Sequence, residues 1–467
     1  MTELHALSAT ELSSAYAAGQ LSPLEVTQAV IDHMARWEPR LCATWAFDAD
    51  VALAMARASE ARWQRGAALG ALDGVPVTLK ENIATRGMPM PLGSAASLLV
   101  PAAADAPPAA RLREAGAVFI ARTTMPDYGM LSSGLSSFHG LTRNPWDLRK
   151  NPGGSSAGAA AAAAAGYGPL HIGTDIGGSI RLPAAWCGVF GLKPSGGRVP
   201  IKPPYLGRVA GPLTRTVADA ALSMVTLTRP DARDATSLPP QDIDWCDIER
   251  EPRAWLRGRR IGLLLDAGWG LPLEEEIAAA VQSAAHAFES AGATVEPMVP
   301  FSTRAMADGI DRFWRMRSWL EISALPPERR VRVLTFIRDW VAAAEGCSAA
   351  QLFDGYSQFA ALRDAAVAAC QPFDFVISPV TPVSAFAAEW AMPSNDPRRA
   401  MEHIGYTLPF NMSEQPAASI DCGHTADGLP IGLQIVGRRH DDLGVLRLAR
   451  AWENLRPAPR PWPAPPG

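Results

Sequence analysis

The strongest constraint on the fold is a run of small residues between two glycine- and serine-rich segments. Residues 159–165 are all alanine, and such small side chains let a helix pack closely against other backbone, so we expect a buried helix here. The preceding stretch, 129–158, is rich in Gly, Ser, Pro and Asn without periodicity, which is typical of a functional or disordered loop. A strand at about 169–173 and a second glycine turn at 173–179 are expected next.

Short β-prone runs alternate with helical stretches along much of the chain. Residues 75–79 (VPVTL) and 117–121 (AVFIA) enclose a helix-like stretch at 109–115. Such alternation is typical of an α/β core with a mostly parallel or mixed sheet. The further expected elements are strands at 260–265, 294–296 and 375–378, an amphipathic helix at 273–291, and an N-terminal helix that opens on a capping box, Ser22-Pro23-Leu24-Glu25.

Composition excludes several classes of protein. The chain has 467 residues, 48% hydrophobic and 19% charged, with a net charge of −4. These values argue against a basic nucleic-acid binder, a disordered chain and a polybasic membrane anchor. Six scattered cysteines without a C-x-x-C pair suit a reducing compartment. Because residues 1–20 lack a signal-peptide pattern and the alanine run is too short to span a membrane, we expect a cytoplasmic protein.

Lysine is rare in this chain: Lys80, Lys150, Lys193 and Lys202 are the only four, against 39 arginines. Lys80 follows the apolar run 75–79 directly, so its side chain can begin in a low-dielectric interior. A buried lysine favours its neutral form and can then act as a general base, which arginine cannot do. The alternative is a lysine at a strand end whose amine reaches solvent.

The two glycine–serine segments, 153–158 and 173–179, carry the other candidate residues. Neither has the Gly-Lys-Ser/Thr or G-x-G-x-x-G pattern of a phosphate-binding loop. Residues 154–158 match G-x-S-x-G, the nucleophile elbow, but that elbow needs a strand immediately before it. The preceding residues, 144–152 (NPWDLRKNP), cannot form one. Taken alone, each segment fits a flexible loop equally well.

Taken together, Lys80 and these segments resemble the amidase signature family of serine hydrolases. Ser179 follows Ser155 by 24 positions, in agreement with the family pattern, and the resemblance extends from about residue 20 to 453. The matching motifs lie at 74–76, 80–82, 153–158, 173–181, 188–194 and 428–434.

The resemblance implies an amidase-signature α/β fold, with a central mixed twisted β-sheet covered by helices on both faces. It also implies a Ser-cisSer-Lys triad. Ser179 would be the nucleophile that forms an acyl-enzyme, and Lys80 would be the general base. Ser155, which the resemblance implies to carry a cis peptide bond, would relay the proton between them. No cofactor or metal ion is expected, because the eight histidines show no clustered ligand spacing.

Other residues take supporting roles by the same resemblance. Backbone N–H groups of Ile176, Gly177, Gly178 and Ser179 would stabilise the oxyanion. Further expected residues are Ser156, Asp175 and Arg181 as supports of the network, and Gly129, Met130, Leu131 and Ser132 beside the substrate. The departures from the family pattern are Ala157, Ala159 and Glu414, the last of which we expect at the pocket rim.

The resemblance also suggests a division of the chain. Residues 300–370 contain Phe313, Trp314, Trp319, Phe336 and Trp340, which either pack helices together or, with Trp390, line a wide apolar pocket, while Arg312, Arg315 and Arg317 could receive a carboxylate. The expected segments are 1–70, a helical segment packing on the core; 71–227, the catalytic core; 228–258, a surface linker; 259–299, a continuation of the core; 300–370, a helical insert; 371–455, the C-terminal part of the core; and 456–467, a Pro-rich tail.

Three functions remain open from the sequence. The first is a hydrolase that cleaves the C–N bond of a small-molecule amide, an aryl amide or a carbamate. The second is a glutaminase-type subunit of a tRNA-dependent amidotransferase, against which the net charge and the lack of a basic patch argue. The third is a non-catalytic binding homologue, which the intact Lys80, Ser155 and Ser179 oppose. We expect no nucleic-acid or membrane partner, and a homodimer stays open.

Overall fold

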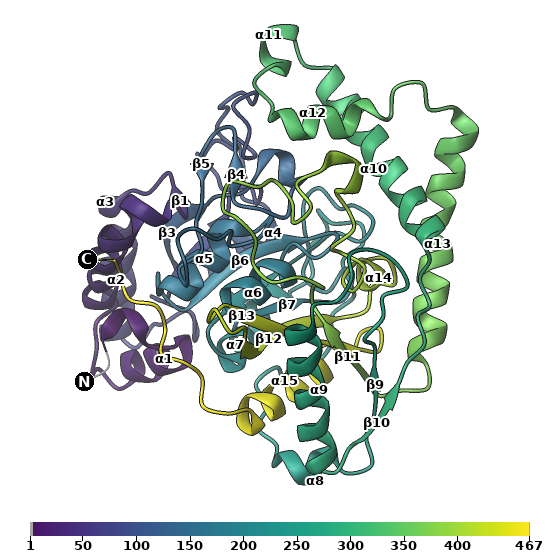
Figure 1. The fold of residues 1–467 in the computed structure, drawn as a ribbon. Coiled ribbons are helices and arrows are strands. Elements are labelled where there is room, and N and C mark those ends of the chain that lie inside the picture. Colours follow the sequence, from purple (N-terminus) through teal and green to yellow (C-terminus); the bar gives the residue numbers. More distant parts are fainter. Residues whose placement is uncertain (1–2, 467) are drawn as a thin grey trace.

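The computed structural model describes residues 3–466 and places a large mixed β-sheet at the centre of the molecule (Figure 1). The sheet has 11 strands in the order β1-β3-β2-β6-β8-β7-β12-β13-β11-β9-β10. Its strands are β1 (Thr44–Trp45), β2 (Pro76–Lys80), β3 (Val118–Thr123), β6 (Leu170–Asp175), β7 (Phe190–Lys193), β8 (Val209–Thr214), β9 (Arg260–Leu263), β10 (Thr294–Pro297), β11 (Phe375–Pro379), β12 (Ala417–His424) and β13 (Pro430–Gly437), and a separate hairpin joins β4 (Leu135–Ser136) to β5 (Gly140–Leu141).

The sheet combines parallel and antiparallel pairs. β2 runs parallel to both β3 and β6, and β9 runs parallel to β10 and β11. The strands between these two parallel groups are antiparallel to their neighbours, including β6 with β8 and β12 with β13. Because β2 and β6 are adjacent and parallel, their carboxyl ends, Lys80 and Asp175, reach the same edge of the sheet.

Helices cover both faces of the sheet, as expected. The alternation of side chains along β7 shows the two faces: Phe190 and Leu192 belong to one hydrophobic core, whereas a Cβ on Gly191 would lie 2.7 Å from that of Ala184 in α6. The helices of the body are α1 (Ala9–Ala17), α2 (Pro23–Leu41), α3 (Ala49–Gln64), α4 (Pro107–Glu114), α5 (Ala157–Ala165), α6 (Arg181–Cys187), α7 (Val217–Leu227), α8 (Pro252–Leu256), α9 (Glu275–Ser290), α14 (Leu408–Met412) and α15 (Asp442–Leu455), with short 3-10 turns η1 (Leu4–Ala6), η2 (Asp127–Gly129) and η3 (Pro397–Arg399).

The all-alanine segment forms α5, which is buried over its whole length. It packs against α6 on the same face of the sheet, where Ala160, Ala164 and Ala184 belong to one apolar cluster. The predicted helix is confirmed. Its small side chains let α5 pack closely against both α6 and strand β6 of the sheet.

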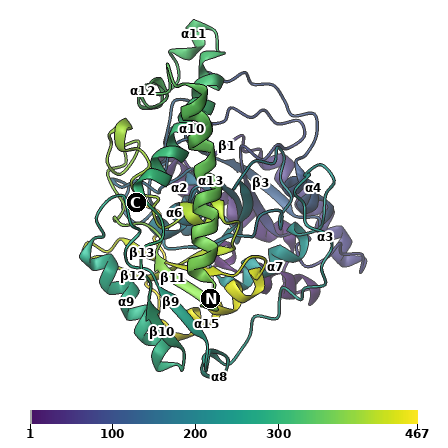
Figure 2. The same ribbon diagram turned by 90° about the vertical axis from the view of Figure 1, so that its right-hand side faces the viewer.

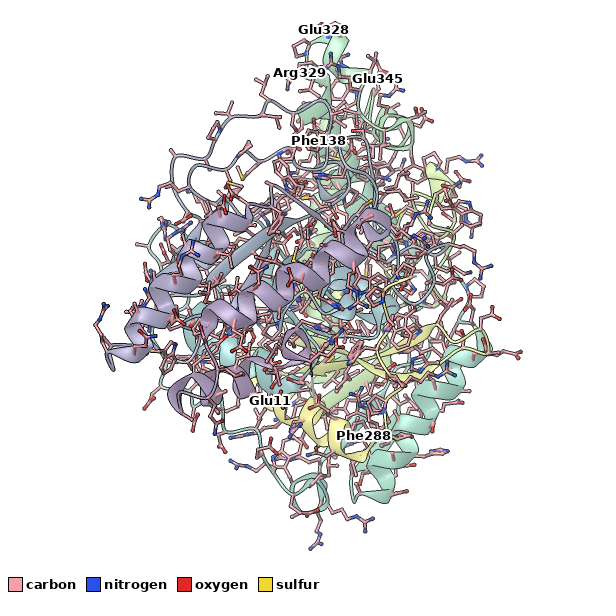
Figure 3. All side chains as sticks on the ribbon, turned by 90° about the vertical axis from the view of Figure 1, so that its left-hand side faces the viewer. Glu11, Phe138, Phe288, Glu328, Arg329 and Glu345 are labelled. Atoms are coloured by element: carbon pink, nitrogen blue, oxygen red, sulfur yellow. The ribbon has the colours of Figure 1, made fainter. Side chains whose placement is uncertain are left out.

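A second group of helices projects from this body between residues 304 and 370. It consists of α10 (Arg304–Ser323), α11 (Pro327–Arg330), α12 (Thr335–Ala342) and α13 (Ala349–Cys370). Figure 2 shows α13 lying across the side of the molecule, and Figure 3 shows Glu328, Arg329 and Glu345 at the opposite end from Phe288 of α9. Arg329 donates a hydrogen bond of 2.7 Å to the carbonyl oxygen of Ala96, which ties the tip of this group to the body.

Three local features differ from the sequence expectations. Ser22 caps α2 by accepting from the N–H of Leu24 at 3.0 Å. The predicted capping box is wrong, because no hydrogen bond joins Ser22 to Glu25 among the described residues, and the Ser22 hydroxyl donates to Glu60 at 2.5 Å. A capping box instead opens α1, between Ser8 and Glu11. Within residues 228–258, Trp245 and other apolar side chains are buried in the core of the sheet.

Within residues 3–466, no helix combines the length and the apolar character needed to cross a membrane.

A buried ion pair connects the centre of the sheet to the helices above it. Arg181, at the start of α6, lies 3.1 Å from Asp175 at the end of β6, and neither side chain is exposed. The guanidinium also donates to Gln434 of β13 at 2.7 Å and to Asn411 of α14 at 2.5 Å. Burial alone would raise the pKa of Asp175, but the charge and hydrogen bonds of Arg181 hold that pKa below its usual value of 3.8.

We expect Arg181→Met to lower the free energy of unfolding by about 3–5 kcal/mol, because it leaves the Asp175 carboxylate buried without a counter-ion. Urea denaturation measured by circular dichroism checks this value. Arg149→Met is the matched control: Arg149 pairs with Asp147 on the surface with 89% of its side chain exposed, and its loss should cost less than about 1 kcal/mol.

The double variant Asp175→Asn, Arg181→Met extends the test to a protein in which no charge is left unpaired. It should lose less stability than Arg181→Met alone. Equal losses in Arg181→Met and Arg149→Met would show that the buried pair does not support the fold.

Candidate active site

A cavity of about 360 Å³ opens beside the edge of the sheet where β2 and β6 end. Ser155 and Ser179 both line it, from the segment before α5 and the turn before α6. The turn at 175–177, the segment 128–132, the loop after Lys202 and the helix α10 form its walls. The structure therefore brings the two glycine–serine segments to one cavity.

Lys80 approaches Ser155 from the interior of the protein. It is the last residue of β2 and its side chain is fully buried. Its Nζ lies 2.8 Å from the Oγ of Ser155, and 3.1 Å from the hydroxyls of both Ser156 and Thr174. Three hydroxyl groups thus surround the amine, and Lys80 forms no ion pair with any described residue within 4.0 Å.

The hydroxyl groups around Lys80 differ in where their hydrogens go. Ser156 donates to the carbonyl oxygen of Thr174 at 3.1 Å, so toward Lys80 it acts as an acceptor. The hydroxyl oxygen of Thr174 accepts from the side-chain amide of Asn82 at 3.0 Å. For Ser155, Lys80 is the single side-chain partner among the residues that the structure describes. The Ser155 hydrogen is therefore free to point at the lone pair of a neutral amine.

Electrostatics favour that neutral amine. Burial lowers the pKa of Lys80 well below its usual value of 10.5, and the positive charge of Arg208 lowers the pKa further. Asp175 and Glu81 oppose this shift, but each is engaged elsewhere: Asp175 by Arg181, and Glu81 by His139 at 2.9 Å.

Ser155 and Ser179 sit on two segments that touch through their backbones. The peptide bond between Gly154 and Ser155 is cis, as the family resemblance implies. The N–H of Ser156 donates to the carbonyl oxygen of Ser179 at 3.1 Å, which fixes the segments side by side. Within residues 3–466, no hydrogen bond joins the hydroxyls of Ser155 and Ser179, although both face the cavity.

The turn from Asp175 to Ser179 is held by the Asp175 carboxylate. That carboxylate accepts the N–H of Gly178 at 2.7 Å and of Ile180 at 3.1 Å. Gly178 has a φ of +130°, where a side chain is disfavoured. Its N–H is committed to Asp175 and is thus not free for an oxyanion, contrary to expectation.

The other predicted donors are Ile176, Gly177 and Ser179. In the described part of the chain no hydrogen bond occupies their N–H groups, and all three residues line the cavity.

The predicted substrate-side residues Gly129, Met130, Leu131 and Ser132 all line the cavity. The aromatic residues of the 300–370 segment divide between the two expected roles: Trp314 and Trp340 line the cavity, whereas Phe313 packs against Tyr356 and Phe359.

Two other expectations are only partly met. Arg312 and Arg315 pair with Asp354 and Asp311, and only Arg317 of the three arginines faces the cavity. Glu414, expected at the rim, instead pairs with Arg363 and Arg439 away from the cavity.

Carboxylates that line the cavity are already engaged. Asp175 is paired with Arg181, and Glu321 lies 3.4 Å from Arg317. Elsewhere Glu3, His5 and His33 place three possible metal-ligand atoms within 4.8 Å of one another. Burial and the nearby charges of His33 and two arginines together lower the pKa of His5 to about 4 against the opposing charge of Glu3. This positive field also opposes a bound cation.

Sequence reasoning missed several residues of this site. Thr174 and Asn82 were within the quoted motifs, and their polar side chains beside Ser156 and Lys80 were a usable signal. Asn411 and Arg208 lie outside all motifs, and the structure alone reveals their positions beside Arg181 and in the cavity wall.

Comparisons with known proteins agree on one family. The family model described as Amidase matches residues 25–446. A glutamyl-tRNA(Gln) amidotransferase subunit from Myxococcus xanthus is 36% identical, with 97% of each chain covered. An acylamidase from Rhodococcus erythropolis is 33% identical over 98% of this chain and 97% of its own length.

Solved structures lead to the same result. A bacterial aryl acylamidase of the amidase signature enzymes superimposes with a TM-score of 0.88 at 31% identity, covering 97% of both chains. With its α/β sheet, two serines that line one cavity and a buried lysine bonded to one of them, the chain belongs to the amidase signature family and is an amide-hydrolysing enzyme.

Proposed function

We propose that the protein hydrolyses the C–N bond of small-molecule amides through an acyl-enzyme on Ser179, with Lys80 as the general base and Ser155 as the proton relay. The observation that carries the proposal is the buried Lys80 amine, 2.8 Å from the Ser155 hydroxyl at the base of the cavity. Aryl amides and carbamates fall within the proposed substrate class, because Trp314 and Trp340 give the cavity aromatic walls. We also propose a cytoplasmic location. A homodimer stays open, as it did from the sequence.

The hydrogen bond between Lys80 and Ser155 supports the first part of the proton path, and the shared cavity supports the part between Ser155 and Ser179. Ser155 transfers its hydroxyl hydrogen to the neutral amine and takes the hydrogen of Ser179, whose oxygen then attacks the amide carbonyl carbon. Ser156 cannot replace Ser155, because its hydrogen is held by the carbonyl of Thr174. When the C–N bond breaks, the proton returns along the same path to the leaving amine, and water then cleaves the acyl-enzyme.

The developing negative charge needs donors beside Ser179. The N–H groups of Ile176, Gly177 and Ser179 supply them, since the N–H of Gly178 is held by Asp175. The pair of Asp175 and Arg181 keeps this turn rigid, so the donors need no reorganisation during attack.

A glutaminase-type amidotransferase component is the second candidate, favoured by the 36% identity to a protein of that kind. The two candidates differ in the substrate and in the need for partners. Ammonia release from glutamine that exceeds hydrolysis of anilides and simple amides would favour the amidotransferase, as would recovery of obligate partner chains with the native protein.

The nucleophile and the base can be tested by substitution. Ser179→Ala and Lys80→Ala should each lower kcat on an anilide substrate by on the order of 10³-fold or more, with unchanged circular dichroism. The first variant lacks the nucleophilic oxygen, and the second lacks the base that takes its proton. Lys80→Arg should be equally inactive, since arginine stays protonated. Lys150→Arg, outside the cavity, is the matched control and should retain wild-type activity.

A fluorophosphonate probe gives an independent readout of the nucleophile. Mass spectrometry should find the adduct on Ser179 in the wild type and in Lys150→Arg. Wild-type turnover in Ser179→Ala, or an adduct on another serine, would contradict the assignment.

The pH dependence of kcat/KM should report the lowered pKa of Lys80. The amine is a base only when neutral, so activity should rise as the pH increases through its pKa and then level off. Because burial lowers that pKa, the midpoint of the rise should lie well below 10.5. A rise centred near 10.5 would show an ordinary, solvated lysine. Lys150→Arg should give the wild-type profile.

A further inference from the structure

Three cationic side chains line the cavity, and they differ in how their charge is balanced. Arg317 of α10 stacks over the ring of Tyr205, with 3.9 Å from its guanidinium carbon to the ring centroid, and lies 3.4 Å from Glu321. Lys202 is exposed, so water solvates its ammonium group. Arg208 has neither arrangement.

Arg208 is half-buried, and its guanidinium donates a hydrogen bond of 2.9 Å to the carbonyl oxygen of Pro203. Within residues 3–466 no carboxylate forms an ion pair with it. Arg181 and Arg198 are buried with a carboxylate partner, Asp175 at 3.1 Å and Asp442 at 3.0 Å. Arg122 and Arg215 have no carboxylate within 4.0 Å in the described part of the chain, but each donates to at least two backbone carbonyl oxygens. Among the described residues Arg208 differs from all four, because it lines the cavity with a single carbonyl partner for its guanidinium. Burial, together with the nearby positive charge of Arg317, lowers the pKa of Arg208 to about 10, so Arg208 remains charged at neutral pH.

The position of Arg208 in the sheet places it beside the chemistry. β8 begins at Val209, which is paired with Asp175 at the end of β6. Arg208 and Ile176 are the next residues beyond this antiparallel pair, at the same edge of the sheet, and both line the cavity. The backbone of Arg208 therefore lies next to the turn that carries the proposed donors for the oxyanion, and its side chain faces the same cavity.

The rest of the cavity wall offers little that could balance this charge. Two carboxylates of the described residues line it and both are engaged, Asp175 by Arg181 and Glu321 by Arg317. Much of the remaining wall is apolar, with Met90, Met125, Met392, Met401 and Trp340 among its residues. An unpaired guanidinium in such surroundings costs free energy that a bound anion recovers, and the planar fork of arginine fits a carboxylate through two parallel hydrogen bonds.

We propose that Arg208 binds a carboxylate carried by the substrate, so that the preferred substrates are amides with an acidic group on either their acyl or their amine part. This inference rests on the proposed function, because it concerns the same cavity and the same bond cleavage. Arg208 acts here in substrate binding and specificity, and the Lys80–Ser155–Ser179 path is unchanged.

Matched substrate pairs test the proposal. On the acyl side, glutaryl p-nitroanilide is compared with valeryl p-nitroanilide; on the amine side, 4-acetamidobenzoate is compared with 4-acetamidotoluene. For at least one pair we expect kcat/KM of the acidic member to exceed that of the neutral member by about tenfold or more, mainly through a lower KM. The pair that shows the preference identifies the part of the substrate that Arg208 contacts.

Substitutions assign this preference to Arg208. In Arg208→Gln the ratio of kcat/KM between acidic and neutral members should fall to about one, and Arg208→Lys should recover part of it. In Arg208→Glu the preference should be reversed: a substrate that carries an ammonium group in place of the carboxylate should have a higher kcat/KM than the acidic member. Arg312→Gln, which removes a guanidinium outside the cavity, is the matched control and should keep the wild-type ratio.

Binding without turnover provides a second measurement, which also covers the case of a poorly folded Arg208→Gln enzyme. Calorimetry with Ser179→Ala should show tighter binding of the acidic member, and glutarate should weaken that binding by competition. Wild-type ratios of one or less in both pairs, or an unchanged ratio in Arg208→Gln, would overturn the proposal while leaving amide hydrolysis intact. If no member of either pair is hydrolysed and Ser179 is not labelled, the proposed function itself fails.

Discussion

A lysine amine buried among hydroxyl groups without a carboxylate partner is the constraint around which this molecule is organised. Two carboxylates reach Lys80 with their charge, Asp175 and Glu81, and each is bound by another group. If either contacted the amine directly, it would stabilise the ammonium form and remove the base. The network of Asp175 with Arg181 therefore has two effects: it holds the turn at 175–179, and it engages the Asp175 carboxylate so that this group does not pair with Lys80.

The same arrangement explains why both parallel and antiparallel pairing occur in the centre of the sheet. Parallel pairing of β2 with β6 brings Lys80 and the turn after Asp175 to one edge. Antiparallel pairing of β6 with β8 brings the loop before Val209 to that edge as well. The proposed base, the proposed nucleophile and a cationic wall thus come from three adjacent strands, although Lys80 precedes Ser179 by 99 positions and Arg208 by 128 positions in the sequence.

Local sequence patterns predicted the elements that depend on local chemistry. The run 75–79 corresponds to β2 at Pro76–Lys80, and the alanine run to α5 at Ala157–Ala165. The family motifs identified Ser155 and Ser179 before any geometry was known, and their roles remain proposals. The hydrogen bond between Gly178 and Asp175 was not predictable, because it depends on the φ of one glycine. Arg208 was also missed, since its proposed role arises from strand order and from the lack of an ion pair with any carboxylate in residues 3–466.

The helices α10 to α13 have a consequence for how enzymes of this shape diversify. α10 and α13 contact each other extensively, and α10 reaches the cavity through Trp314, Arg317, Ser318 and Glu321. The proposed proton path from Lys80 to Ser179 lies entirely within residues 80–181 and uses none of these side chains. Mutation can therefore reshape the substrate wall over successive generations while the reaction chemistry is inherited unchanged, which makes α10 the natural segment to randomise when new amide substrates are sought.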